Sequence, residues 1–220
     1  MKILALEFSS PERSVAVVQP PIEGRPQVEA EVVETGTTAT KPLGMIEEAL
    51  REAKLEREQI EVLAVGLGPG SYTGIRTAIA LAQGWQLARG VKLLGISSAE
   101  CIAAEAQAEG IFGQVAVVID AQRGEFYLSL YELGPAARRE VEALKLASGA
   151  EVQARLEAGM QLIGPEVTVS FPHGRQVLPL AGMLGRLAAD RNNFVAGETL
   201  EPIYLRQTTF VKASPVMRLS

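Results

Sequence analysis

The stretch of the sequence best suited to chemistry is a glycine-rich segment at residues 62–77. Its first four residues are apolar and predict a short buried strand. The glycines that follow force a turn, because only glycine adopts positive φ without strain. Residues 72–89 favour a helix, and Gly90 is a typical helix stop. Such a turn leaves backbone N–H groups free at a helix N-terminus, where an anion can bind. The candidate residues of this turn are Gly68, Gly70, Ser71 and Thr73.

The spacing of this turn matches no standard phosphate or nucleophile motif. A Walker loop needs a lysine after its last glycine, and none follows Gly70. A dinucleotide fingerprint needs two residues between its last two glycines, but three separate Gly70 from Gly74. A nucleophile elbow needs glycines two positions before and after Ser71, and neither position holds one. The spacing therefore leaves open both an anion site and a structural turn that lets helix and strand pack closely.

The composition is typical of a soluble globular protein. Hydrophobic residues make up 47% of the 220 residues and charged residues 21%. This length is enough for one large domain or two small ones. The net charge is −5, and the longest basic run is Arg138-Arg139. Because a protein that grips nucleic acid by itself usually shows a basic face, direct binding of RNA or DNA is disfavoured.

The single cysteine and the N-terminal segment indicate a reducing compartment. Cys101 lies in an alanine-rich segment and is typical of a small buried residue, and one cysteine excludes an internal disulfide. The N-terminal apolar run meets an acid at Glu7, too early for a signal peptide. No apolar run reaches membrane-spanning length. We therefore expect a cytoplasmic protein without a membrane partner.

The first half of the chain predicts three strands followed by alternating helices and strands. The three strands are expected at residues 3–8, 14–19 and 27–35. A helix follows over residues 42–54, with Thr40 as its cap and Pro42 in its first turn. After the glycine-rich segment comes a strand at 92–96. Ser97 and Glu100 then form a capping-box pattern for a helix to about residue 108. The predicted order is βββαβαβα.

The same pattern begins again near residue 114. Strands are expected at 115–119, 125–133, 140–146 and 160–163, and helices at about 149–158 and 179–190. Ser148 and Glu151 form a second capping-box pattern. Glu7 and Asp120 each close the first strand of a half and precede a turn. The sequence thus predicts an internal repeat, with one lobe at residues 1–108 and a smaller one at 109–220.

A duplicated meander-plus-helix unit is similar to the actin/Hsp70/sugar-kinase (ASKHA) superfamily. This resemblance implies an α/β fold of two RNase H-like lobes, each a mixed sheet with helices. It also implies that two hairpin turns face the phosphates of a nucleotide across a cleft, with the acids at the strand ends organising Mg²⁺. The candidate nucleotide or cleft residues are Glu7, Ser9, Ser10, Gly68, Gly70, Ser71, Thr73, Asp120 and Arg123.

Four segments resemble one family of this superfamily, the TsaB (YeaZ-like) family. They are residues 66–76, 94–100, 120–127 and 201–206, so the resemblance covers most of the chain. It implies a protein of the bacterial pathway that makes threonylcarbamoyladenosine at position 37 of tRNA. It also implies a partner role, in which the protein pairs with the catalytic subunit TsaD and the ATPase TsaE joins the pair.

Several residues favour a partner role over catalysis. The catalytic paralogue holds a metal with two helical histidines, whereas this chain has only His173, in a predicted turn, so no metal site is expected. The family's usual Asp-Thr-Ser is Glu7-Phe8-Ser9 here, which removes a hydroxyl and is expected to shift the longer carboxylate outward. The turn after Asp120 lacks an early glycine or hydroxyl. We expect no tightly bound cofactor, and ATP or ADP with Mg²⁺ at most in the complex.

The helix expected at residues 72–89 is apolar on more than one face, so more than one face must be covered. The sheet can cover one face and the first helix part of a second. The remainder could receive a helix from TsaD or from a second copy in a homodimer; alternatively, the domain buries everything itself. Ala80, Gly84 and Ala88 are small residues at i, i+4 spacing. The candidate partner residues are Leu43, Ile46, Leu50, Ile75, Arg76, Ala78, Ile79, Ala82, Trp85 and Gln86.

Three functions can be distinguished on these grounds. The first is a non-catalytic subunit required for threonylcarbamoyl transfer to tRNA, which contacts tRNA through the complex. The second, suggested by the paired acids Glu7 and Asp120, is an ATP-dependent small-molecule kinase or ATPase of the same fold. The third is a protease, which would need Ser71 as nucleophile and His173 as base. The first function predicts a chain that is chemically idle on its own.

Overall fold

The first lobe is built on a five-stranded mixed sheet. The computed structural model describes residues 1–22, 25–36 and 41–205. The strands are β1 (Ile3–Glu7), β2 (Glu12–Ile22), β3 (Arg25–Thr35), β4 (Val62–Gly66) and β5 (Lys92–Ile96), in the order β3-β2-β1-β4-β5. The first three strands form an antiparallel meander, and β4 and β5 extend the sheet in parallel with β1.

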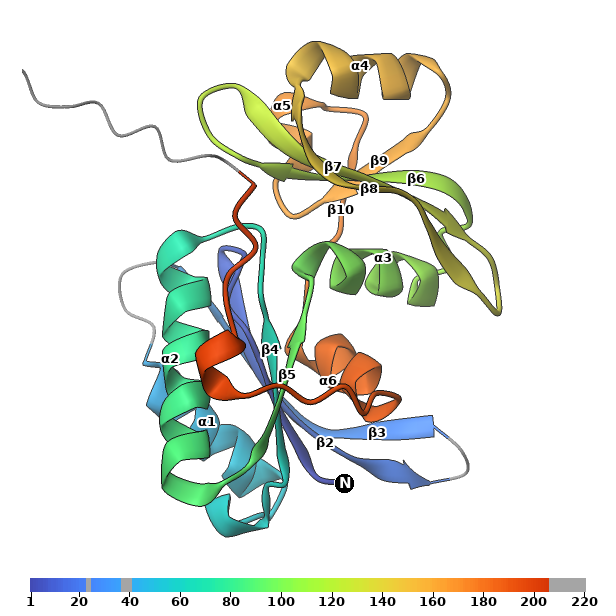
Figure 1. Cartoon of the computed structure of the whole chain (residues 1–220). Helices are drawn as coiled ribbons and strands as arrows, with labels where there is room; N and C mark the ends of the chain where they lie inside the picture. Colours follow the sequence, from blue (N-terminus) through green and yellow to red (C-terminus); the bar gives the residue numbers. More distant parts are fainter. Residues whose placement is uncertain (23–24, 37–40, 206–220) are drawn as a thin grey trace, which may run out of the picture.

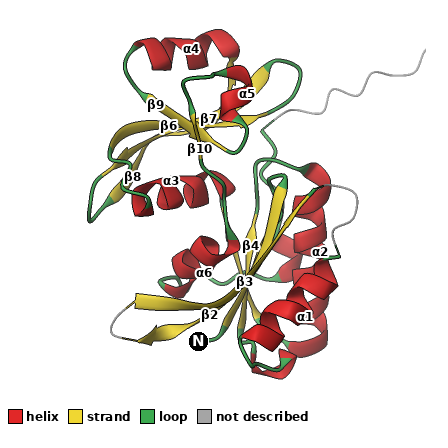
Figure 2. Cartoon of the chain, turned by 180° about the vertical axis from the view of Figure 1, so that it is seen from behind, coloured by secondary structure: helices red, strands yellow, loops and turns green. Residues whose placement is uncertain are grey.

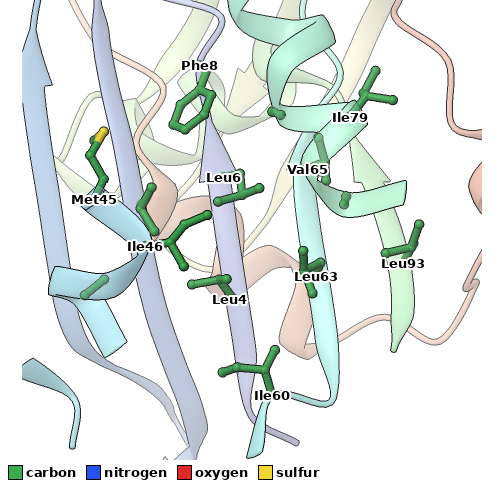
Figure 3. Packing of buried hydrophobic residues seen from close by; sticks show 14 of the residues in the cluster. Leu4, Leu6, Phe8, Met45, Ile46, Ile60, Leu63, Val65, Ile79 and Leu93 are labelled. Atoms are coloured by element: carbon green, nitrogen blue, oxygen red, sulfur yellow. The ribbon is translucent and has the colours of Figure 1, made fainter. Parts of the chain in front are cut away.

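Helices cover both faces of this sheet (Figure 1). The helices α1 (Pro42–Glu52) and α2 (Tyr72–Arg89) pack on one face, against Leu4, Leu6 and Leu63. Figure 3 shows this core, with Phe8, Met45 and Ile46 beside the leucines. The other face is covered by α6 (Ala181–Ala189). Successive strand residues point to opposite faces, so a strand buried on both faces must be largely apolar. In β1 and β4 every residue except Glu7 is apolar or glycine.

The second lobe repeats this design. Its sheet contains β6 (Gly113–Asp120), β7 (Glu125–Leu133), β8 (Arg138–Ser148), β9 (Gln161–Gly164) and β10 (Arg175–Gln176) in the order β10-β9-β6-β7-β8. In both lobes the third, second, first, fourth and fifth strands are therefore neighbours. Here too the meander is antiparallel and the later strands are parallel. The predicted fold class, the internal repeat and the order βββαβαβα are confirmed.

Each half of the chain contributes one helix that packs on the sheet of the other half (Figure 2). Helix α3 (Ser98–Ala108) packs mainly on the second sheet, through Ile102 and Ala106, while the opposite face of that sheet carries α4 (Gly149–Glu157) and α5 (Val167–Ser170). After β10 the chain returns to the first lobe as α6. The division into residues 1–108 and 109–220 stays a prediction. It assigns α6 to the second lobe by sequence, whereas α6 packs on the first sheet.

Several local predictions meet different outcomes. The capping box of Ser148 and Glu151 is present, with both reciprocal hydrogen bonds. The one predicted at Ser97 is wrong, because Ser97 caps α3 without a side-chain hydrogen bond. Helix α1 begins at Pro42 as expected, but its predicted cap, Thr40, lies outside the described residues. The sequence did not predict α5, β10 or the 3₁₀ turns η1 (Arg57–Gln59) and η2 (Gly197–Thr199).

None of the helices in the described part of the chain combines the length and apolarity of a membrane span.

Candidate functional site: the interlobe cleft and the outer face of α2

A cleft of about 330 Å³ lies between the lobes, and both hairpin turns line it. We call it the interlobe cleft. The first hairpin and the start of α2 form one wall, and the second hairpin with the end of β9 forms the other. Its lining residues are Ser9, Ser10, Pro11, Gly70, Ser71, Tyr72, Ile119, Asp120, Ala121, Gln122, Tyr127, Pro165 and Glu166.

The glycine-rich turn is held against the first hairpin by direct backbone contact. The Ser71 N–H donates to the carbonyl oxygen of Ser9 at 2.7 Å. A Cβ on Gly70 would lie 2.1 Å from that same oxygen, and one on Gly74 would lie 2.0 Å from the Phe8 carbonyl oxygen. Only glycine allows such a close approach. Both glycines therefore serve the close packing of helix and strand.

The cleft brings together five of the nine candidate nucleotide or cleft residues: Ser9, Ser10, Gly70, Ser71 and Asp120. The other four do not line it. Thr73 and Arg123 are exposed, while Gly68 and Glu7 are buried. The Ser71 hydroxyl accepts the Gly74 N–H at 3.3 Å and so caps α2.

The expectation that the Glu7 carboxylate shifts outward is wrong, because the side chain is fully buried. Its Oε1 accepts the Ser9 N–H at 2.8 Å, and its Oε2 accepts the Ser98 hydroxyl at 2.8 Å. A Cβ on Gly66 would lie 2.0 Å from Oε2. The glycine at this position of the neighbouring strand therefore leaves room for the Glu7 side chain. Burial raises the pKa of Glu7 above its ordinary value, although the hydrogen bonds from Ser9 and Ser98 oppose this rise.

The Ser98 hydroxyl joins three elements at this point. It donates to Glu7 at the end of β1 and accepts the Gly68 N–H of the glycine-rich turn at 3.1 Å. Ser98 itself is the first residue of α3, which packs on the second lobe. This serine, which the sequence pattern assigned only to a helix start, therefore ties the turn, the first hairpin and the interlobe helix together.

Asp120 holds its own turn. Its Oδ1 accepts the Gln122 N–H at 2.7 Å, and its Oδ2 accepts the Gln122 side-chain amide at 2.9 Å. Gln122 and Arg123 have φ values of 64° and 61°, in the left-handed region that non-glycine residues seldom adopt. The Asp120 carboxylate thus stabilises a strained turn and already accepts a hydrogen bond on each oxygen.

These residues do not fit the nucleotide–Mg²⁺ site that the superfamily implies. Among the described residues, the cleft lining contains the carboxylates of Asp120 and Glu166 but no lysine, arginine or histidine. The Glu7 carboxylate is buried and does not line the cleft. Within residues 1–22, 25–36 and 41–205, no group of three or more His, Cys, Asp or Glu side chains is arranged to hold a metal ion.

Most of the candidate partner residues are in the core of the first lobe. Ile46, Leu50, Ile75, Ala78, Ile79 and Ala82 are buried in the cluster between the sheet, α1 and α2. Their assignment as contact residues is corrected, because the sheet of the same chain covers them. Leu43 and Arg76 are exposed, whereas Trp85 and Gln86 are half-buried. Gln86 bonds to Val91 and Gly197 within the chain.

The opposite side of α2 is exposed, and its exposed residues between Arg76 and Arg89 are uncharged. This outer face of α2 comprises Thr73, Ala80, Gly84, Leu87 and Ala88. A groove of about 420 Å³ separates it from α1, with Leu43, Leu81 and Trp85 in its lining. On its other side, the segment from Leu200 to Tyr204 forms a second groove of about 400 Å³. Periodicity predicted an uncovered face on this helix but did not identify which residues form it.

The first turn of α2 carries an aromatic pair that sequence reasoning missed. The rings of Tyr72 and Tyr204 stack with centroids 5.5 Å apart and planes 26° apart. The Ile203 N–H donates to the Leu67 carbonyl oxygen at 2.9 Å, which fixes the late segment beside the glycine-rich turn. The only sequence signal for this contact is that Tyr204 belongs to the motif at residues 201–206.

The repeated strand order, with a cleft between two facing hairpins, defines the chain as a two-lobed protein of the ASKHA class. A family model described as TsaD, tRNA N6-adenosine threonylcarbamoyltransferase, matches residues 39–176. The Escherichia coli tRNA threonylcarbamoyladenosine biosynthesis protein TsaB is 30% identical over 98% of this chain and 99% of its own length. TsaB of Haemophilus influenzae is 33% identical over 59% of this chain and 53% of its own.

The solved structure of YeaZ from Pseudomonas aeruginosa superposes with a TM-score of 0.75 and 27% identity, covering 93% of this chain and 99% of that one. The chain therefore belongs to the TsaB (YeaZ) family, as its motifs predicted. It is a homologue of proteins of tRNA threonylcarbamoyladenosine biosynthesis.

Proposed function

We propose that this chain is a non-catalytic subunit required for threonylcarbamoyl transfer to adenosine 37 of tRNA. It binds and activates the catalytic subunit TsaD, and the ATPase TsaE joins the pair. Transfer takes place in the cytoplasm, and tRNA contacts the chain through the complex. In the absence of TsaD, a second copy of the chain occupies the same face. The single observation that carries the proposal is similarity to TsaB over the full length of the chain.

The geometry of the cleft supports a partner role over an enzymatic one. Glu7 is buried, Asp120 holds its own turn, and Ser71 caps α2. These three side chains, which a kinase, ATPase or protease would use, are thus committed to the structure of this chain. ATP or ADP and Mg²⁺ would then bind at most in the complex.

The outer face of α2 supports the assignment of that helix to partner binding. Gly84 lies in the middle of the helix, where glycine is about 1 kcal/mol less favourable than alanine. A Cβ on Gly84 would meet nothing within 4 Å, so the fold of this chain does not require glycine there. Together with Ala80 and Ala88, it leaves a shallow track along which the backbone of another helix can approach closely.

Reconstitution tests the proposal. Purified TsaD, ATP, the threonylcarbamoyl donor and tRNA should give modified tRNA only when this chain is added. Modification by TsaD without it would overturn the proposal, as would robust turnover of ATP by this chain alone. Size-exclusion chromatography with mass measurement, after co-expression with TsaD and TsaE, gives the composition of the complex.

One variant tests whether TsaD binds the outer face of α2. Gly84→Leu should raise the melting temperature slightly, because it removes a mid-helix glycine, and yet weaken TsaD binding by filling the track. Ala154→Leu is the matched control, because it adds the same exposed side chain to α4 on the second lobe. Equal affinity of the two variants for TsaD would retire the outer face of α2 as the contact surface.

A further inference from the structure

Arg76 borders the outer face of α2 near the N-terminal end of the helix. Arg76 is exposed and lines the groove between α2 and the segment from Leu200 to Tyr204. It also lines a shallow hollow of about 580 Å³ on α2, with Tyr72, Thr73, Thr77, Ala80 and Leu81. Between Arg76 and Arg89 the exposed residues of α2 are uncharged. A partner that covers this face in the way proposed above therefore also covers Arg76.

Aromatic contacts fix the orientation of Arg76 before any partner binds. Its Nη1 donates to the Tyr72 hydroxyl at 2.8 Å, and its guanidinium carbon lies 5.1 Å from the centroid of the Tyr72 ring. Tyr204 stacks on Tyr72 and holds that ring in place. A guanidinium that is already oriented loses less entropy when it binds a further acceptor.

The neighbouring cations have acidic partners within the chain. Arg51 pairs with Glu48, Arg57 with Glu47 and Arg89 with Glu58, at distances of 3.7, 2.5 and 3.2 Å. None of the ion pairs formed among the described residues includes Arg76. Glu201 lines the same groove without pairing to it.

We infer that the partner that docks on α2 places an aspartate or glutamate against the Arg76 guanidinium. This inference rests on the proposed function. Burying an unpaired charge is unfavourable, so a partner that covers this face must bring a compensating group. A carboxylate is favoured over a nucleic-acid phosphate, because the net charge is −5 and Asp120 and Glu166 line the adjoining cleft.

The test measures the affinity of purified TsaD for three variants over a range of salt concentrations. Arg76→Met keeps the aliphatic stem but removes the charge, and Arg76→Lys keeps the charge but lacks the planar guanidinium. Arg51→Gln on α1 is the control, because its ion pair at 3.7 Å is exposed. We expect Arg76→Met to raise the Kd at least about 10-fold and to flatten its salt dependence, Arg76→Lys to fall between, and Arg51→Gln to match the wild type.

Wild-type binding to TsaD together with an unchanged Kd for Arg76→Met would overturn the inference and leave the proposed function standing. A Kd for tRNA that rises in Arg76→Met while the Kd for TsaD does not would also overturn it, and would identify the ligand as phosphate. Absence of wild-type binding to TsaD would overturn both the inference and the proposed function. Equal melting temperatures of all four proteins show that the differences are not due to unfolding.

Discussion

Replacing Ser98 by alanine should destabilise the protein far more than replacing its neighbour Ser97. The change removes the donor to the buried Glu7 carboxylate and the acceptor of the Gly68 N–H. A hydrogen bond to a charged group contributes about 1.5–3 kcal/mol, and a buried N–H left without a partner costs about 1–3 kcal/mol. We therefore expect Ser98→Ala to lower the free energy of unfolding by about 3 kcal/mol.

Thermal and urea unfolding, each followed by circular dichroism, measure this loss. For a chain of this size, about 3 kcal/mol corresponds to a fall in melting temperature of roughly 6–12 °C. Ser97→Ala should change the free energy of unfolding by less than about 0.5 kcal/mol, because Ser97 makes no side-chain cap bond. The reasoning is refuted if the two alanine variants are equally stable, or if Ser98→Ala melts with the wild type.

Three further outcomes are expected. Ala82→Glu should prevent cooperative thermal unfolding, because it places a charge in the core. Ala80→Glu on the outer face should melt at the same temperature as the wild type. An equal loss of stability in both variants would contradict the assignment of the buried and outer faces of α2. Burial, together with the nearby Glu31 carboxylate, raises the pKa of Glu105 from 4.5 to about 7. The folded state then keeps a proton that the unfolded chain releases, so this contribution to stability is complete below pH 4.5 and is lost as the pH rises to about 7. Glu105→Gln should flatten the stability curve over that range in urea titrations, and an unchanged curve would refute the shift. Ser148→Ala should lower the free energy of unfolding by about 1 kcal/mol in the same assay, because it breaks the capping box of α4.

The elements that sequence patterns predicted well carry their signals locally. Helix α2 was expected at residues 72–89 and spans Tyr72–Arg89, because Ser71 caps it and Gly90 ends it with a φ of 68°. The strands β1, β4 and β6 each contain a continuous apolar run, at residues 3–6, 62–65 and 115–119, so burial on both faces was readable from composition. By contrast, α5 has four residues and β10 has two, too few for any periodicity to show.

The parts of the site that were missed depend on contacts between distant residues. Glu7 points inward because Gly66 leaves it space and Ser98, 91 residues away, donates to it. No local pattern around Glu7 encodes either neighbour. The buried side of α2 was likewise undecided, since two apolar stripes compete on that helix and only the sheet determines which one is covered. The motif at residues 201–206 marked Tyr204 but not the ring on which it stacks.

The return of α6 to the first sheet means that the repeat is not made of two independent folding units. If the polypeptide were cut between residues 108 and 109, the first fragment would lose the cover over Ile3, Ala5 and Leu94. That fragment should be insoluble when expressed alone and should be rescued by the second fragment expressed in trans. Any truncation or split of this chain must therefore keep residues 181–189 together with the first lobe, although the sequence places them after the second.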